Sequence, residues 1–259
     1  MCGRFGLIAT WEEMAAMYGL IGGPPEAMRI MPPRYNIAPT QPVLAIRESA
    51  GGGREATFFR WGLVPSWAKD IDIGARTINA RAETVAEKPA FRAAFRRRRC
   101  LIPVSGFYEW CAVAGQSTKQ PYWIAMNDGK PFSFAGLWEV WQSPDGEELQ
   151  SCTVVTTDAN AALRPIHHRM PVIVAPADHD AWLSHAAAAR EYDTAAPAAL
   201  MRPWADGALV ATPVGRLVNN VRNDGPDLIR RAEPGDALPP KPARSAGAKP
   251  VDSPQGSLF

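Results

Sequence analysis

The sequence has few cysteines and histidines and lacks any long apolar run. It contains four of each among 259 residues, and the widely spaced cysteines form no C-x-x-C pair. This spacing predicts neither a disulfide framework nor a structural zinc site, so the cysteines are expected to be thiols. No stretch approaches the roughly 18 apolar residues of a membrane-spanning helix, and no long apolar segment typical of a signal peptide follows the first residues. We therefore expect a cytoplasmic protein with no membrane segment and no metal.

A strong excess of charge of one sign is also missing. The sequence has 28 Lys and Arg against 26 Asp and Glu, a formal net charge of +2, and 46% of its residues are hydrophobic. This composition is typical of a globular protein. Because the net charge is small, a nucleic-acid partner would require a local basic patch rather than a field over the whole molecule.

Short apolar strands and few helices predict an α+β fold with a curved, largely antiparallel sheet flanked by helices. A capping box at Thr10–Glu13 begins a helix that Gly19 can close. Strands are expected at Val43–Arg47, Thr57–Val64, Cys100–Val104, Tyr122–Met126, Phe132–Leu137, Cys152–Thr156, Val172–Ala175 and Leu209–Thr212. These elements predict one domain over residues 2–232. From 233 to 259 the chain is rich in Pro, Gly, Ala, Ser and Lys, which predicts a disordered tail.

Two further helices are expected. A second capping-box sequence, Thr84–Glu87, predicts a helical stretch that continues through Phe91 and Phe95. The basic run Arg96–Arg99 is expected to be the solvated end of that helix. The other helix is expected around Asp178–His185.

Cys2 directly follows the initiator methionine. If Met1 is removed, residue 2 carries a free α-amine and a thiol on adjacent carbons. Such a pair condenses with an aldehyde to an imine, and the thiol then closes a five-membered thiazolidine ring. An α-amine has a pKa of about 7.7–8.0, so a useful fraction is unprotonated at neutral pH. Taken alone, Cys2 also fits a buried thiol or a small residue at a frayed terminus.

Two other segments carry groups suited to chemistry. Asn79 offers amide donors and an acceptor, and Arg81 can fork onto a phosphate. Both also fit loop capping with a surface salt bridge. Glu109 is a single carboxylate among aromatic residues after an apolar strand, where apolar surroundings favour the protonated form and suit a general acid and base. The alternative is an outward-facing strand residue.

A third segment sets an imidazole, His167, and a guanidinium, Arg169, just before an expected strand. A hydrogen-bonded structural histidine is the alternative for His167. The segment Phe59–Trp67 carries two tryptophans on either side of a turn. Trp61 is expected in the core, whereas Trp67 offers a surface on which bases can stack.

Together these segments resemble a single protein family. The matching motifs are MCGRF at the N-terminus, RYNIAPT at Arg34–Thr40, FRWGLVPSW at Phe59–Trp67, INARAET at Ile78–Thr84, IPVSGFYEW at Ile102–Trp110 and IHHRMPV at Ile166–Val172. In this order they resemble the SOS-response-associated peptidase (SRAP) family. The resemblance runs from Cys2 to about Ile229.

The resemblance implies a compact α+β domain with a barrel-like sheet and a basic channel for single-stranded DNA. Cys2 would be the nucleophile, exposed once Met1 is cleaved and then linked to the ring-opened abasic deoxyribose. Asn79 would sense the abasic sugar, Glu109 would shuttle protons, and His167 would stabilise the sugar. The neighbouring His168 falls at a variable position of the motif and lies outside this set. DNA contacts are implied for Arg4, Asn36, Pro39, Trp67, Arg81, Thr156 and Arg169.

The implied function is an abasic site processing enzyme of the DNA damage (SOS) response. It would sense abasic sites in single-stranded DNA and shield them by a covalent thiazolidine crosslink through Cys2, without a cofactor. Peptidase-like self-removal of Met1 and an AP-lyase side activity from the same imine are also implied. We expect a monomer associated with damaged or replicating DNA in the nucleoid. Two alternatives remain open: an autocatalytic cysteine peptidase, and a non-covalent reader of modified or single-stranded DNA.

Overall fold

The computed structural model describes residues 2–20, 23–24, 32–49, 51–115, 117–184 and 194–233. The strands are β1 (Phe5–Leu7), β2 (Arg34–Ile37), β3 (Pro42–Glu48), β4 (Arg54–Trp61), β5 (Asn79–Arg81), β6 (Arg99–Val104), β7 (Gly106–Cys111), β8 (Gln120–Met126), β9 (Phe132–Gln142), β10 (Glu148–Asp158), β11 (Arg169–Pro171), β12 (Ile173–Val174) and β13 (Leu209–Pro213). The helices are α1 (Trp11–Tyr18), α3 (Arg92–Arg97), α4 (His179–Leu183) and α5 (Ala195–Leu200), with 3-10 turns η1 (Ile71–Arg76), η2 (Pro176–Asp178), η3 (Arg216–Asn219) and η4 (Pro226–Ile229). This mixture confirms the α+β class.

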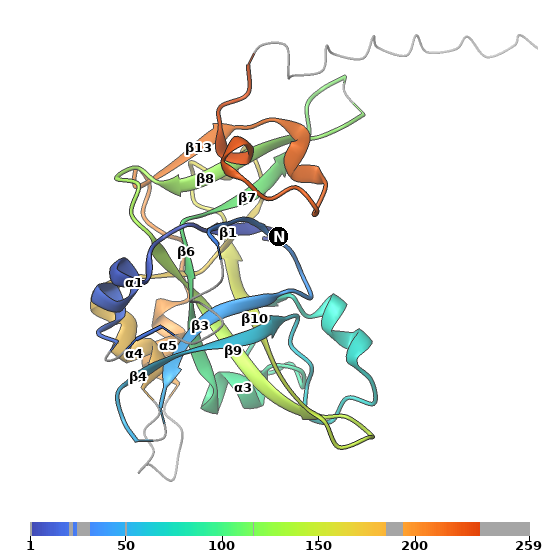
Figure 1. The fold of residues 1–259 in the computed structure, drawn as a ribbon, viewed down its shortest axis with the longest axis vertical. Coiled ribbons are helices and arrows are strands. Elements are labelled where there is room, and N and C mark those ends of the chain that lie inside the picture. The colour runs from blue at the N-terminus through green and yellow to red at the C-terminus, as the bar shows by residue number, and fades with distance from the viewer. Residues whose placement is uncertain are drawn as a thin grey trace, which may run out of the picture.

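Five strands close into a ring, which forms the lower part of the molecule in Figure 1. β3 pairs with β4 and β6, β6 pairs with β9, and β9 pairs with β10, all antiparallel. A parallel pairing of β10 with β4 completes the circle. β5, β11 and β12 add to the ring through β10 and β9. The curved, largely antiparallel, barrel-like sheet expected from the sequence is confirmed.

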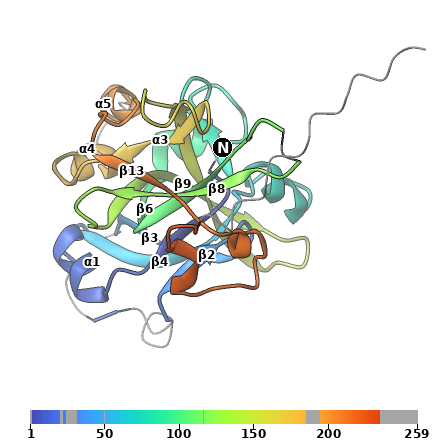
Figure 2. The ribbon, with the colours of Figure 1, turned by 90° about the horizontal axis from the view of Figure 1, so that it is seen from above.

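A second sheet of five antiparallel strands lies above the ring in Figure 1 and is seen from above in Figure 2. Its order is β13-β8-β7-β1-β2. The central pair, β1 and β7, matches Phe5 with Phe107 and Gly6 with Gly106. Gly106 must be glycine, because a Cβ there would lie only 2.3 Å from the ring of Trp123 on β8. This sheet therefore holds the amino-terminal strand directly beside the strand that carries Glu109.

An aromatic cluster joins the two sheets. The Phe5 ring of β1 packs against Trp61 of β4 at 5.0 Å and against Phe134 of β9 at 6.0 Å between centroids. All three side chains are buried, and burying a side chain of this size contributes roughly 1.5–3 kcal/mol. The expectation that Trp61 belongs to the core is confirmed.

The first helix forms as its sequence predicts. Glu13 N donates to Thr10 Oγ1 at 3.2 Å, and Thr10 N donates to Glu13 Oε2 at 2.8 Å, so both halves of the capping box are present. Gly19 then takes the left-handed conformation, with φ of 63°, and ends α1. The helix buries Met14 and Tyr18 against the core.

The second capping-box prediction is wrong. Residues 82–91 form consecutive turns, and the helix α3 begins only at Arg92. Pro89 lies within that segment and has no N–H to donate, which interrupts any helix started at Thr84. The basic run is a solvated helix end only in part. Arg96 and Arg97 are exposed in the last turn of α3, whereas Arg99 begins β6, is only 1% exposed, and donates to carbonyls including that of Trp182 at 2.6 Å.

The other expected elements are present with different bounds. The strands β9 and β10 extend to 11 residues each, longer than expected, and α4 confirms a helix within the expected segment 178–185. The strands β1, β2, β5, β7 and β11 and the helix α5 were not among the expected elements. The predicted disordered tail lies, apart from its first residue, outside the described residues. Within the described residues, no helix is both long and apolar enough to cross a membrane.

Candidate active site

Cys2 lies three residues before the start of β1 and is buried. Its Sγ is 3.8 Å from the carbonyl oxygen of Arg4. Burial, with a further contribution from the nearby Glu109 carboxylate, raises the pKa of the Cys2 thiol well above its usual range. The thiol is therefore protonated at neutral pH, so this residue is not a preformed thiolate nucleophile.

Asn79 opens β5 and reaches Cys2 directly. Its Nδ2 donates to the Cys2 carbonyl oxygen at 2.8 Å. The parallel pairing of β5 with β10, which sets Asn79 opposite Val154, fixes the position of this side chain. Its Oδ1 is buried and accepts no hydrogen bond from the described residues. The site therefore holds an acceptor able to take a hydrogen bond from a hydroxyl group of a ligand.

Glu109 lies on β7 and is only 4% exposed. The register of β1 with β7, extended by the Tyr108 N–H donating to Arg4 O at 2.9 Å, brings this carboxyl beside the amino-terminal residues. Burial raises the pKa of Glu109, and the positive charge of the amino terminus acts in the opposite direction. Burial thus favours a carboxyl that keeps its proton.

His167 lies in the loop between β10 and β11 and is half-buried. Its Nδ1 is 3.0 Å from the backbone N of Arg169 and 3.2 Å from the carbonyl oxygen of the same residue. When Nδ1 accepts from the Arg169 N–H, the neutral ring carries its proton on Nε2, whereas an Nδ1–H would donate to the carbonyl oxygen instead. Burial, followed by the positive charge of the amino terminus, lowers the pKa of His167. His168, which is exposed, stacks on this ring at 4.4 Å between centroids.

Two of the predicted DNA contacts hold a loop of the protein. Asn36 is 1% exposed, and its Nδ2 donates to the carbonyl oxygens of Val218, Asn220 and Asn223 at 3.3, 3.1 and 2.8 Å. Arg4 donates to Asn36 Oδ1 at 2.7 Å and to Val218 O at 2.8 Å. These contacts anchor the segment 218–223 over β2, so the structure gives both side chains partners inside the protein.

The remaining predicted DNA contacts divide by exposure. Trp67 is 58% exposed and Arg81 is also exposed, while Pro39 is half-buried. Thr156 is fully buried, with Oγ1 3.4 Å from the carbonyl oxygen of Ala80. Arg169 is 7% exposed and forms salt bridges within the protein. The DNA-binding roles of all seven residues stay predictions.

Sequence reasoning missed the carboxylates that hold Arg169. Glu83 and Asp158 lie 2.7 and 2.8 Å from its Nη1. Glu83 belongs to the INARAET motif, two residues after Arg81, so its position in that motif was the available signal. Asp158 had none, because its role depends on the pairing of β10 with β11.

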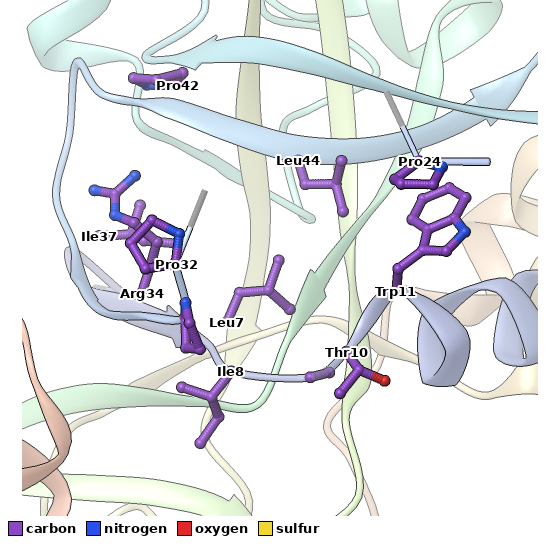
Figure 3. Close-up of a pocket in the computed structure, with 12 residues that line it drawn as sticks. Leu7, Ile8, Thr10, Trp11, Pro24, Pro32, Arg34, Ile37, Pro42 and Leu44 are labelled. Atoms are coloured by element: carbon purple, nitrogen blue, oxygen red, sulfur yellow. The ribbon is translucent and has the colours of Figure 1, made fainter. Parts of the chain in front are cut away.

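Among the described residues, no group of three or more His, Cys, Asp or Glu side chains could hold a metal ion. An apolar pocket of about 290 Å³ lies elsewhere, between the β1–α1 connection and β3 (Figure 3). Leu7, Ile37 and Leu44 contribute to its walls, with Trp11 and several prolines at its edges. Cys2, Asn79, Glu109 and His167 are not among its lining residues.

Comparison with known proteins identifies the family. The family model for SOS response associated peptidase (SRAP) matches residues 1–221. The chain belongs to the SRAP family. It is 38% identical over 229 residues to the abasic site processing protein YoqW of Bacillus subtilis (strain 168), covering 88% of this chain and 99% of YoqW. It is 31% identical over 252 residues to the abasic site processing protein HMCES of Rattus norvegicus, covering 83% of this chain and 69% of HMCES.

Solved structures share this fold. An X-ray crystal structure of a protein from Bacteroides thetaiotaomicron superposes with a TM-score of 0.78 at 28% identity, covering 90% of this chain and all of that chain. A phage-related protein from Bordetella bronchiseptica superposes with a TM-score of 0.62 at 26% identity, covering 82% and 94%. The family resemblance read from the six motifs is confirmed.

Proposed function

We propose that this SRAP protein processes abasic sites in single-stranded DNA by forming a covalent crosslink through Cys2. The observation that carries the proposal is the position of Cys2, the second residue of the chain, between Asn79 and the buried carboxyl of Glu109. The names of its relatives, abasic site processing proteins, support the substrate. The crosslink would shield the lesion during the DNA damage (SOS) response in the cytoplasm.

The reaction begins with hydrolysis of the Met1–Cys2 peptide bond, which consumes one water and leaves a free α-amine on Cys2. This amine attacks the C1′ aldehyde of the ring-opened sugar to give a carbinolamine. Loss of water gives an imine, and Cys2 Sγ then adds to the imine carbon while its proton passes to the nitrogen. The product is a thiazolidine, and the capture step releases one water in total. Because the thiol is protonated, the amine and not the sulfur is the first nucleophile.

Three side chains support these steps. Glu109, whose pKa is raised by burial, donates a proton to the leaving hydroxyl of the carbinolamine and recovers it later. Asn79 Oδ1 accepts a hydrogen bond from a sugar hydroxyl. The Nε2–H of neutral His167 donates to an oxygen of the open sugar.

DNA would bind along the exposed side chains beside this site. Trp67 and Pro39 would stack against bases of a kinked strand, and Arg81 would contact a backbone phosphate. Recognition would be independent of sequence, because an abasic nucleotide has no base to read. A β-elimination from the same imine would give an AP-lyase side reaction.

Trapping with abasic single-stranded DNA tests the proposal. Cys2→Ala is expected to abolish the adduct that survives heating and denaturing electrophoresis, while reversible DNA binding stays near wild type. Cys111→Ala is the matched control, since Cys111 is a half-buried thiol outside the proposed machinery, and it should crosslink normally. Intact-mass measurement checks that Met1 has been removed in each protein. A Cys2→Ala protein that forms an equally stable adduct would overturn the thiazolidine proposal.

The same measurement addresses peptidase chemistry. If the Cys2 thiol cleaves its own amino-terminal bond, Met1 should be retained in Cys2→Ala protein made without a methionine aminopeptidase and lost in wild type made in the same way. Loss of Met1 from both would assign the cleavage to another agent.

A further inference from the structure

Arg169 is a buried cation whose hydrogen bonds are nearly all taken by the protein. Its Nη1 donates to Glu83 Oε1 at 2.7 Å and to Asp158 Oδ1 at 2.8 Å, and its Nη2 donates to Glu83 Oε2 at 2.9 Å and to Thr156 O at 2.7 Å. Four acceptors therefore match the four hydrogens of the two Nη atoms. A phosphate could bind these atoms only by displacing one of the acceptors.

The four acceptors come from two separate segments. Glu83 lies in the turn after β5, whereas Thr156 and Asp158 lie at the end of β10. Arg169 itself begins β11, opposite Asp158. The guanidinium thus ties the β5 segment, which carries Asn79, to the loop that carries His167. It does so across the strand β10, with which both β5 and β11 pair.

The backbone of Arg169 also faces the imidazole of His167. Its N–H meets Nδ1 when the ring is neutral, and its carbonyl oxygen, 3.2 Å away, can accept from Nδ1 when the ring is charged. The position of the Arg169 backbone therefore influences the tautomer and the orientation of His167. The guanidinium and these backbone atoms belong to the same residue, so a shift of the Arg169 side chain from its anchored position can move the atoms that hold the ring.

We propose that Glu83 is a positioning residue that acts through Arg169 on His167. The inference rests on the proposed function, because it assigns Glu83 a part in capture of the abasic sugar. Glu83 holds both Nη atoms at once, whereas Asp158 holds one, and the side chain of Glu83 is the less exposed, at 49% against 71%. A bidentate carboxylate fixes a guanidinium in angle as well as in distance. Glu83 is thus the partner that sets the orientation of Arg169, and Asp158 supplies a weaker second contact.

The competing interpretation is a latch. In that case Glu83 would occupy Arg169 only until DNA arrives, and a phosphate would then replace the carboxylate. The two interpretations predict opposite effects of the same substitution on DNA affinity. Glu83→Gln has the same shape but lacks the second acceptor oxygen, so it weakens the bidentate contact without emptying the space.

The experiment compares Glu83→Gln, Asp158→Asn, His167→Ala and the Glu83→Gln/His167→Ala double variant, all with Met1 removed. The single-turnover rate of adduct formation is measured at saturating abasic DNA across pH, together with affinity for lesion-free single strands at several salt concentrations. Glu83→Gln should lower the rate by about tenfold to a hundredfold, as expected for a misplaced catalytic group, with affinity within about twofold of wild type. Asp158→Asn should have a smaller effect on the rate.

The double variant separates positioning from general damage to the fold. If Glu83 acts through His167, Glu83→Gln should have almost no further effect on the rate in the His167→Ala protein. Additive losses would overturn the proposal. Tighter DNA binding with a steeper salt dependence in Glu83→Gln would also overturn it, in favour of the latch.

A second measurement needs no adduct. The imidazole ¹⁵N shifts of DNA-free protein should show that Glu83→Gln changes the tautomer balance or the pH titration of His167, with the exposed His168 as an internal reference. Unchanged His167 shifts would overturn the proposal. Absence of any adduct in wild type would overturn the proposed function instead, and the shifts would still report the coupling.

Discussion

At the scale of single residues, the proposed chemistry depends most on the protonation of Glu109. The side chain is 4% exposed on β7, between Tyr108 and Trp110, and burial raises its pKa. A carboxyl with a pKa raised toward the working pH can both give and recover a proton within one reaction cycle. Crosslink formation needs a proton for the departing hydroxyl, and reversal needs one for the departing sulfur or nitrogen. One carboxyl can serve both directions.

We predict that Glu109→Gln slows both formation and release of the adduct, because the amide cannot cycle a proton. Loss of one positioned general acid typically costs about 10²–10⁴ in rate. The wild-type rate should be bell-shaped in pH, since the reactive fraction of the amine rises with pH while protonated Glu109 declines through its raised pKa. The Glu109→Gln profile should keep only the rising limb. Time courses of adduct formation, and of release into competitor abasic DNA, measure both directions.

Wild-type rates in both directions would instead make Glu109 a structural residue and leave His167 as the first candidate for the proton shuttle. Loss of DNA binding in Glu109→Gln would also count against the proposed role. Binding to lesion-free strands is therefore measured on the same protein.

Asn36 illustrates what residue-level reasoning could not supply. The RYNIAPT motif marked it as a site residue, and the structure gives it a buried position with three carbonyl acceptors from 182 to 187 residues further along the chain. Nothing in the local sequence names those partners, because they belong to irregular backbone near the C-terminal end of the domain. For Cys2, Asn79 and Glu109 the local chemistry suggested a reactive role beside a structural alternative, and the family resemblance supplied the role, which stays a prediction.

At the scale of elements, the sequence predicts a helix or strand correctly where neighbouring residues alone decide whether it forms. Thr10 and Thr84 each begin a capping-box sequence, yet only the first caps a helix. After Thr84, the N–H groups of Glu87 and Lys88 donate to its carbonyl oxygen at 3.1 and 2.9 Å, and Pro89 then breaks the ladder. The proline could have corrected the prediction from the sequence alone. By contrast, the three-residue strands β1 and β5 are too short to show a period and exist through pairing with longer strands.

The packing of α4 against α1 and β9 contains a histidine that should control stability in acid. His179 is fully buried, its Nε2 lies 3.0 Å from Ser133 Oγ, and its ring stacks on Tyr18 at 5.1 Å. Burial, with the nearby charge of Arg54, lowers the pKa of His179 to about 4. The folded protein therefore holds this ring neutral down to a pH at which an unfolded histidine, with a pKa of about 6.5, is charged.

We predict that His179 makes the protein acid-sensitive. Because folding lowers the pKa of His179, its contribution to the free energy of unfolding is complete above about pH 6.5 and is lost as the pH falls toward 4. The loss approaches about 3 kcal/mol in the free energy of unfolding, from a shift of roughly 2.5 pH units. Urea unfolding of wild type and His179→Phe between pH 7 and pH 4 measures it, because phenylalanine keeps the ring but cannot titrate. Curves that fall in parallel would show that His179 does not titrate on unfolding.

At the scale of the whole molecule, topology assembles a site that is scattered in the sequence. Asn79 and Glu109 lie beside Cys2 because β1 pairs with β7 and β5 pairs with β10, and His167 lies in the loop before β11, which also pairs with β10. Hydrophobic periodicity indicates which face of a strand is buried, but it does not name the partner strand, and β5 pairs parallel across more than 70 residues. The α+β class and most strands could thus be derived from pattern. The grouping of the site residues came only from the family resemblance.

The net charge of the molecule is too small to contribute much to DNA binding. The formal net charge is only +2, and several arginines are paired with carboxylates, among them Arg34, Arg47, Arg54, Arg98 and Arg169. Arg81 ends β5, is exposed, and makes no salt bridge within the described part of the chain. A phosphate contact near the site should therefore depend on this side chain more than on the general field.

We predict that Arg81→Ala weakens binding to all single strands alike, with or without an abasic site, and makes the salt dependence shallower. Loss of one phosphate contact should reduce the slope of log K against log salt by about 0.7 for a single strand. The matched control is Arg96→Ala, which removes the same charge from an exposed position on α3, at the far end of the barrel from the amino terminus in Figure 1. Its slope should equal that of wild type. Equal changes in both variants would mean that binding responds to net charge. If the Arg81→Ala defect is confined to strands that contain the lesion, Arg81 contacts the sugar and not the backbone.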